Sequence, residues 1–254
     1  MSPVVAFIRG RTPIPAKDML RSSIGALLTL AGLALIIRLT GAAHLTAWLV
    51  PSIGSSAVLV FALPASPLAQ PRAVLGGNIL SALVGVTVAL TIPDLVVASA
   101  VAVAAAIVVM SWLGCLHPPG GAVALGAVMT AASGHAGYGY VLPIGAGSIL
   151  LVASAAFYLN LTGRSYPHRA PSAVNVHKTR DREPLSRAGY TLADLDGALS
   201  KYGELLDVSR EDLDALFRQV ELEAHQRLHS QIKCEDIMSR DVLTIYAHQT
   251  AESA

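Results

Sequence analysis

A long apolar block, flanked by two polar segments, dominates the pattern of this chain. Residues 23–162 carry three charged side chains in 140 positions, whereas residues 1–22 carry five and residues 163–254 carry twenty-seven. The hydrocarbon core of a bilayer is about 30 Å thick, and a straight helix needs roughly 20 apolar residues to cross it. The block therefore predicts an all-α integral membrane protein that lies in a lipid bilayer.

Breaks within the block divide it into four long and two short apolar segments. The long segments cover residues 24–48, 75–92, 95–114 and 140–161. The three charged residues of the block are Arg38, Arg72 and Asp94. Arg38 lies within the first long segment and is expected to snorkel to the interface. The short segments, 55–63 and 121–132, are too short to cross the core as straight helices.

Proline and glycine precede both short segments, in VPSIGSSAVLVFALPASPLAQPR (50–72) and in CLHPPGGAVALGAVMTAASG (115–134). Proline preorganises a first helical turn and glycine admits close backbone approach, so the pattern predicts short helices that begin near Gly54 and Gly120 at membrane depth. The order long, short, long occurs twice, and these two glycines are 66 residues apart. This order predicts an internal repeat of about 65 residues.

Loop charge favours six crossings over four. Cytoplasmic loops carry an excess of Lys and Arg, and basic residues flank the block on both sides, so both termini are expected in the cytoplasm. Four and six crossings both satisfy this, but only six place Arg72 inside and the uncharged loops outside. We therefore predict two inverted long-short-long repeats with six membrane segments, followed by a cytosolic helical hairpin.

Two inverted halves would bring the N-termini of the short helices together near the midplane, an arrangement that presents amide groups to an anion. No buried Asp or Glu is available for a cation, so a small inorganic anion is the predicted ligand. The predicted anion-binding residues are Gly54, Ser55, Ser56, Ala57, His117, Gly120, Gly121 and Ala122, and the predicted pathway or vestibule residues are Arg72 and Asn78.

Five of these candidates also have a purely structural interpretation. Ser55 and Ser56 are small enough to serve only close helix packing. His117 is either a protonatable gate or a cap on a helix end. Arg72 is either an anion attractant or a topology charge, and Asn78 is expected mainly to hydrogen-bond between helices.

The segment HPPGGA, residues 117–122, resembles the signature of the HPP family of integral membrane proteins, and GSSAVLVFALPASPLAQPRAVLGGN, residues 54–78, is similar to that family's other conserved stretch. The resemblance covers about residues 20–162. It implies membrane transport, with nitrite as the substrate associated with characterised relatives in plastids and cyanobacteria. The family pattern usually has Gly-Pro and then Gly-Ala-Ser, where this chain has Pro51-Ser52 and then Gly54-Ser55-Ser56, so a hydroxyl replaces a methyl at Ser55 and can alter the preferred anion.

The polar C-terminal part divides into three predicted segments: a linker (163–188), a cytosolic helical hairpin (189–232) and the truncated start of a CBS domain (233–254). Thr191 and Ser209 are the expected N-caps of the two helices. Glu221, His225 and His229 share a helix face, which is more typical of a solvated surface than of a metal site. The segment CEDIMSRDVLTIYAHQTAESA, residues 234–254, resembles the entry of a CBS domain, and so short a piece implies no adenosine-nucleotide cleft.

Other classes of protein are disfavoured. The net charge is +1 and the basic residues are scattered, which argues against nucleic-acid binding. The two cysteines are 119 positions apart, and no HExxH, GxSxG or paired intramembrane carboxylates occur, so neither a metal site, a cofactor nor an enzyme is predicted.

The sequence as a whole predicts transport of a small inorganic anion, nitrite first, with an anion-sensing receptor that signals through the cytosolic helices and the CBS region as the alternative. Small residues on the apolar segments favour a homo-oligomer. A bacterial inner membrane is the expected location, with residues 1–22 as a cytosolic N-terminal segment and 23–162 as the transmembrane domain.

Overall fold

The computed structural model describes residues 15–41, 46–135, 137–170, 190–202 and 206–231. Within these ranges every regular element is helical. The chain divides into two units, which are described separately: residues 1–170 with 205–209, and residues 171–204 with 210–254. Among the described residues of the first unit, four helices are long and apolar enough to cross a membrane, namely Ala16–Leu39, Pro71–Thr91, Leu95–Trp112 and Tyr138–Leu161.

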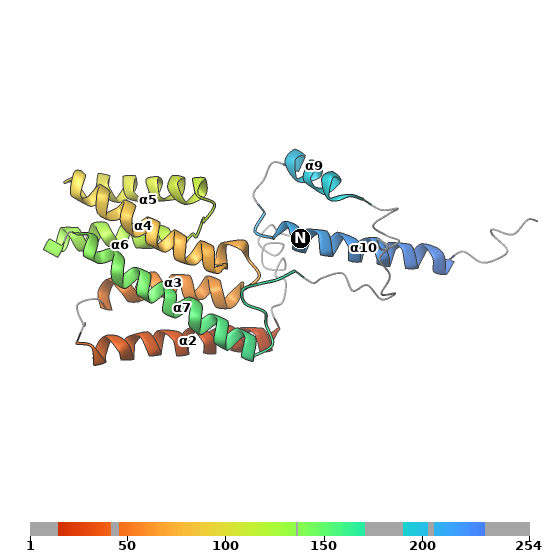
Figure 1. Cartoon of the computed structure of the whole chain (residues 1–254), viewed down its shortest axis with the longest axis horizontal. Helices are drawn as coiled ribbons and strands as arrows, with labels where there is room; N and C mark the ends of the chain where they lie inside the picture. The colour runs from red at the N-terminus through yellow and green to blue at the C-terminus, as the bar shows by residue number, and fades with distance from the viewer. Residues whose placement is uncertain (1–14, 42–45, 136, 171–189, 203–205, 232–254) are drawn as a thin grey trace, which may run out of the picture. The chain divides into compact units, whose positions relative to one another are not determined.

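Six main helices build the described part of the first unit. The chain reverses direction from each one to the next (Figure 1). They are α2 (Ala16–Leu39), α3 (Thr46–Ala62), α4 (Pro71–Thr91), α5 (Leu95–Trp112), α6 (Gly120–Thr130) and α7 (Val141–Leu161). Three single turns join them: η2 (Pro67–Ala69), η3 (Ala131–His135) and η4 (Tyr138–Tyr140).

Local chemistry accounts for several helix ends. Pro71 opens α4 at a position where its missing N–H has no intrahelical partner. The Asp94 carboxylate caps α5 by accepting from the Val97 amide at 2.8 Å. Gly114, with φ of 62°, ends α5 in the left-handed conformation that glycine adopts without strain. The next helix therefore starts after the short connection 113–119.

Helix α4 lies at the centre of the unit, where it packs against α5, α6 and α7, while α3 packs against α2, α6 and α7. The remaining large contacts are α2 with α7 and α5 with α6. Close approach of α4 and α6 depends on Gly85, because a Cβ there would lie 2.6 Å from the carbonyl oxygen of Ala124. Small residues at helix contacts are typical of membrane bundles, in which packing replaces the hydrophobic effect as the driving force.

The three long segments predicted at 75–92, 95–114 and 140–161 correspond to α4, α5 and α7, and the second short segment corresponds to α6. The expected break at Gly54 is wrong. Helix α3 begins at Thr46 and contains Pro51, and the segment predicted to run to residue 48 ends as α2 at Leu39. A proline removes one backbone donor, whereas ending a helix in lipid leaves several backbone groups without partners, so the helix continues through it.

The membrane unit also extends beyond its predicted bounds. Helix α2 starts at Ala16, within the segment expected to be a polar N-terminal arm. Tyr166, expected in a linker, is 2% exposed, and its hydroxyl donates to the Ala69 carbonyl at 2.8 Å. The packed part of this unit therefore continues past the end of α7. Arg38 lies exposed in the last turn of α2, as snorkelling requires.

The described residues of the second unit contain two helices where two were predicted, α9 (Leu192–Tyr202) and α10 (Arg210–Gln231). Thr191 caps α9 in a reciprocal pair with Asp194, and Ser209 directly precedes α10. Arg210 forms an ion pair with Asp196 between the two helices. The predicted linker residues 171–188, the CBS-like residues 233–254 and the side chains of His225 and His229 lie outside the described part of the structure.

Candidate functional site

Four fully buried polar side chains from four different segments meet inside the first unit. Ser56 Oγ of α3 lies 2.9 Å from Nε2 of His117, which directly precedes α6. The amide nitrogen Nδ2 of Asn78, on α4, donates to Ser56 Oγ at 3.2 Å and to Ser148 Oγ, on α7, at 3.0 Å. We call Ser56, Asn78, His117 and Ser148 the polar network.

The surroundings determine where each hydrogen of the network lies. His117 Nδ1 faces the backbone carbonyl of Leu68 at 2.8 Å, and because a carbonyl only accepts, Nδ1 carries the proton. In the neutral imidazole Nε2 then accepts from the Ser56 hydroxyl at 2.9 Å, the shorter of its two contacts, since the Ser52 carbonyl oxygen lies 3.3 Å from the same hydroxyl. Asn78 uses both hydrogens of Nδ2, and Ser148 donates to the Ile144 carbonyl at 2.8 Å. Every polar hydrogen of the network therefore has a partner.

One acceptor of the network has no partner within the described structure: the carbonyl oxygen Oδ1 of Asn78, which is fully buried. Buried polar atoms in folded proteins are nearly always hydrogen-bonded, and an unpaired one costs free energy. The network thus contains an unfilled position for a hydrogen-bond donor.

The buried interior around this network is uncharged. Among the described residues the buried polar side chains are Ser, Thr, Asn and His, with no Asp, Glu, Lys or Arg. A bound ion would therefore meet no fixed opposite charge there, although it would meet the dipoles of helix ends and hydroxyl groups.

Two glycines give His117 and the start of α6 their positions. A Cβ on Gly77 would lie 2.5 Å from the His117 Cβ, and a Cβ on Gly120 would lie 2.5 Å from Ser81 Oγ. Residues 117–119, which we call the HPP segment, therefore lie directly against α4 at Gly77, the residue that precedes Asn78. The glycine pair that precedes Asn78 in the sequence is the local signal for this close approach.

The structure corrects the expectation that free amides of two opposed helix N-termini line the site. At α6 the amides of Gly120, Gly121 and Ala122 donate to the carbonyls of His117, Pro118 and Pro119 at 2.8, 3.1 and 3.0 Å. At α3 the residues from Gly54 to Ala57 lie inside the helix, which begins at Thr46. Neither set of amides is at an open helix end, so side chains, rather than backbone N–H groups, supply the polar surface.

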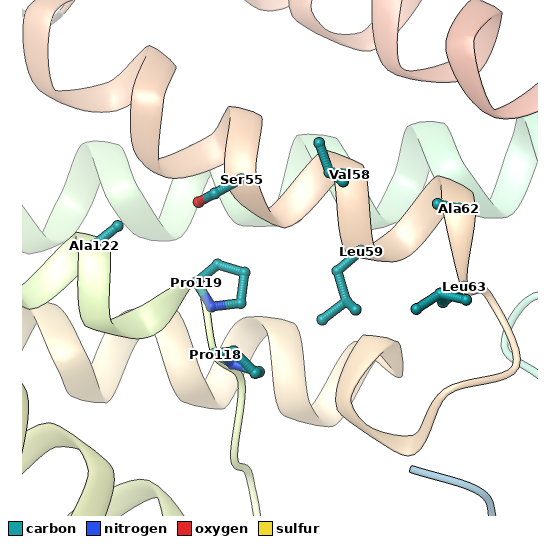
Figure 2. Close-up of a pocket in the computed structure, with 8 residues that line it drawn as sticks. All are labelled: Ser55, Val58, Leu59, Ala62, Leu63, Pro118, Pro119 and Ala122. Carbon is teal, nitrogen blue, oxygen red and sulfur yellow. The ribbon is translucent and has the colours of Figure 1, made fainter. Parts of the chain in front are cut away.

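An open pocket of about 400 Å³ lies between α3 and the HPP segment (Figure 2). Ser55 supplies the polar side chain of its lining, and the two motif prolines form part of its wall. The lining residues are Ser55, Val58, Leu59, Ala62, Leu63, Pro118, Pro119 and Ala122. The pocket is thus mainly apolar and combines residues from both sequence motifs.

The predicted site residues consequently separate into groups. Ser56, His117 and Asn78 belong to the polar network, and Ser55 and Ala122 line the pocket. The remaining four predicted anion-binding residues belong to neither: Ala57 and Gly120 are buried, and Gly54 and Gly121 are half-buried.

Arg72 has a structural partner of its own. Its guanidinium Nη2 donates to the Leu113 carbonyl at the C-terminal end of α5, at 3.1 Å, and its side chain is exposed. A cation at a helix C-terminus is favourable because of the helix dipole. Arg72 is therefore not part of the polar network.

Sequence reasoning did not identify Ser148. This serine is a single small polar residue in an apolar run, which carries no local signature. The signal that could have found it is the repeat, because Ser148 follows Asn78 by 70 residues, close to the predicted repeat length.

Comparisons with known proteins place these features in a family. The family described as HPP, transmembrane region, matches residues 11–167. Two transmembrane proteins of Dictyostelium discoideum are similar to the chain: one is 42% identical over 128 residues, which is 48% of this chain and 41% of the relative, and the other is 40% identical over 125 residues, 47% and 44% respectively. The chain thus spans less than half the length of these curated relatives. No solved structure matches it.

Proposed function

Because the chain belongs to the HPP transmembrane family, we propose that it is an integral membrane transporter for a small inorganic anion, with nitrite as the first candidate. The observation that carries the proposal is the 2.9 Å hydrogen bond between Ser56 and His117. It joins the two motif-bearing segments, 61 residues apart, at a buried polar cluster inside an apolar helical unit. In membrane proteins such buried polar groups are expensive and mark substrate pathways.

We also propose that two inverted repeats form the membrane unit, α2 to α4 and α5 to α7. Exchanging the halves leaves the set of packed pairs unchanged: α2 with α3 corresponds to α5 with α6, and α4 with α5 corresponds to α7 with α2. The contact of α4 with α6 likewise corresponds to that of α7 with α3. The alternating direction of the helices gives the two halves opposite orientations (Figure 1).

Burial patterns support the same repeat. Both α2 and α5 bury one residue in every four, and α4 and α7 are both 21 residues long. A shift of 70 residues superimposes buried positions of α4 on buried positions of α7. The matched pairs are Val74 with Ile144, Gly77 with Gly147, Asn78 with Ser148, Ser81 with Leu151, and Gly85 with Ala155.

Inverted-repeat transporters bind substrate near the midplane, where the two halves meet. The polar network has this position in the proposed repeat, since Ser56 and Asn78 come from the first half and His117 and Ser148 from the second. The pocket that Ser55 lines, bounded by the motif prolines next to His117, is the proposed entrance.

Six membrane crossings complete the proposal. Helix α3 has 17 residues and α6 has 11, which correspond to about 26 Å and 17 Å of helix, so α6 needs its flanking turns to complete a crossing. Six crossings would leave the N-terminus and residue 170 on one face, and the excess of basic residues in the flanks favours the cytoplasm for that face. A homo-oligomer in a bacterial inner membrane, without a catalysed covalent step, remains part of this proposal.

The test is flux through proteoliposomes that contain the purified chain. Uptake of nitrite is compared with uptake of nitrate, formate and chloride, and we expect nitrite to be taken up fastest. Ser56→Leu and His117→Ala should reduce uptake to that of protein-free liposomes. Ser81→Ala is the matched control, because Ser81 is buried one turn along α4 and bonds Met110 Sδ instead of the network.

Absence of flux for every anion, from protein whose folding is verified by its thermal transition, would overturn the transport proposal. Nitrite binding without flux, measured by calorimetry on the same protein, would instead support the receptor function. The two outcomes differ because a transporter must open to both sides of the membrane, whereas a receptor needs access from one side.

A further inference from the structure

Within the described part of the chain, one polar atom of the network has no hydrogen-bond partner, and this atom is an acceptor. The hydrogens of His117 Nδ1, Ser56 Oγ and Ser148 Oγ all have acceptors, and both hydrogens of Asn78 Nδ2 are used. The unpaired atom is Asn78 Oδ1. A ligand that completes this network must therefore bring a donor.

The orientation of the Asn78 amide follows from its neighbours. If the amide were turned round, Oδ1 would have to accept from the Ser56 and Ser148 hydroxyls. Ser56 has a single hydrogen, so Nε2 of His117 would then have no donor. The orientation with Nδ2 toward both hydroxyls is the one that leaves no hydrogen and no imidazole nitrogen unpaired, and it directs the unpaired oxygen away from them.

A bare anion does not match this vacancy. Nitrite offers only acceptor atoms, and against Asn78 Oδ1 it would place negative charge beside a carbonyl oxygen. The buried part of the described unit has no cationic side chain that would compensate. The conjugate acid of the anion is neutral and carries one O–H, which is the donor that the vacancy requires.

We propose that the polar network binds its substrate as the protonated, neutral weak acid, with the O–H of the acid donating to Asn78 Oδ1. This inference rests on the proposed transport function. For nitrite, the acid forms from one nitrite and one proton on the side of entry and dissociates into the same two ions on release. One proton therefore crosses with each nitrite, and no net charge moves.

Proteoliposomes loaded with a pH-sensitive dye test this stoichiometry. With potassium and valinomycin setting the membrane potential, nitrite uptake should acidify the lumen by one proton per nitrite and should not change with the potential. At fixed total nitrite the initial rate should rise about tenfold for each unit fall in external pH, since the acid is the minor species there. Protein-free liposomes give the unaided permeation of the acid, which is subtracted.

Asn78→Leu removes the acceptor while keeping the branched shape of the side chain and should abolish the protein-dependent component, whereas Ser81→Ala on the same helix should retain it. Nitrite flux that responds to potential and leaves the lumen pH unchanged would overturn the inference while leaving the transport proposal intact. Nitrite uptake by Asn78→Leu at the rate of the unsubstituted protein would also overturn it, because Asn78 Oδ1 would then bind at most a structural water. Absence of all flux would instead contradict the transport proposal itself.

Discussion

Asn78 and Ser148 form a 3.0 Å hydrogen bond between α4 and α7, and each is the eighth residue of a 21-residue helix. Equivalent positions of two halves meet in this way where an axis relating the halves passes between them. The bond therefore joins the polar network to the proposed symmetry of the fold.

Ser148→Ala removes an acceptor from Asn78 and should lower the free energy of unfolding by about 1 kcal/mol, the size of a polar contact between membrane helices. Thermal or denaturant unfolding in detergent measures the change. Ser154→Ala, a half-buried serine farther along α7, is the control and should change stability less. Equal effects of the two substitutions would contradict a specific role for the Asn78–Ser148 bond.

Ser55 and Ser56 are neighbours that the structure assigns to different surroundings. Ser56→Ala leaves His117 Nε2 and Asn78 Nδ2 each short of a partner in a buried site, and we expect a loss of about 1–3 kcal/mol in unfolding free energy. Ser55 lines the open pocket, so the unfolding free energy of Ser55→Ala should stay within about 0.5 kcal/mol of that of the parent protein. A larger loss at Ser55 than at Ser56 would reverse this assignment.

The sequence predicted the helical membrane unit, the bounds of α5 and α7, the end of α4 and the start of α6, because long apolar runs and Pro-Gly breaks carry these features locally. It selected Ser56, Asn78 and His117 but attributed anion binding to backbone amides. The expected open N-terminus is wrong at α3 because the helix continues through Pro51, and at α6 because the first amides of the helix bond the carbonyls of residues 117–119. Which side chains pair across 61 and 70 residues is a property of tertiary packing and has no local signature.

Gly77 should be intolerant of any side chain. A Cβ there would lie 2.5 Å from His117 Cβ and 3.0 Å from the Cys115 carbonyl oxygen, so Gly77→Ala must displace the HPP segment. We expect a loss of about 1–3 kcal/mol in unfolding free energy, as for an overpacked core, together with loss of nitrite uptake.

Gly145→Ala is the matched control, because a Cβ at Gly145 would meet Ile79 at an ordinary 3.7 Å. It should be neutral or should stabilise α7 by up to about 1 kcal/mol through higher helix propensity. If Gly77→Ala behaved like Gly145→Ala in the same unfolding assay, the close contact of α4 with the HPP segment would be disproved.

The second unit should respond to acid through Asp196. The hydrogen bond from Arg210 lowers the pKa of the Asp196 carboxyl below its usual value of 3.8, so the ion pair contributes above that value and is lost as the pH falls through the lowered pKa. Both side chains are exposed, so the effect is small. Spin labels on α9 and α10 of the full chain should report a broader distance distribution once the pH falls below the lowered pKa of Asp196, and Asp196→Asn should show the same breadth at neutral pH. Identical distributions for both proteins at all pH values would contradict a role of this pair in holding α9 against α10.

Six crossings and four crossings differ in the side on which the connection between α3 and α4 lies. With six crossings, Ala65 lies on the same face of the membrane as the N-terminus, and Thr91, at the end of α4, lies near the opposite face. With four crossings the two positions are exchanged: Ala65 lies opposite the N-terminus and Thr91 lies near the N-terminal face. Single cysteines at Ala65 and Thr91, both exposed in the structure, can be placed in a background of Cys115→Ala and Cys234→Ala. A membrane-impermeant maleimide added to oriented vesicles should label Ala65→Cys and an N-terminal cysteine tag from one side and Thr91→Cys from the other. Labelling of Thr91→Cys together with the tag would show that α3 re-enters without crossing, and the two halves would then not be inverted.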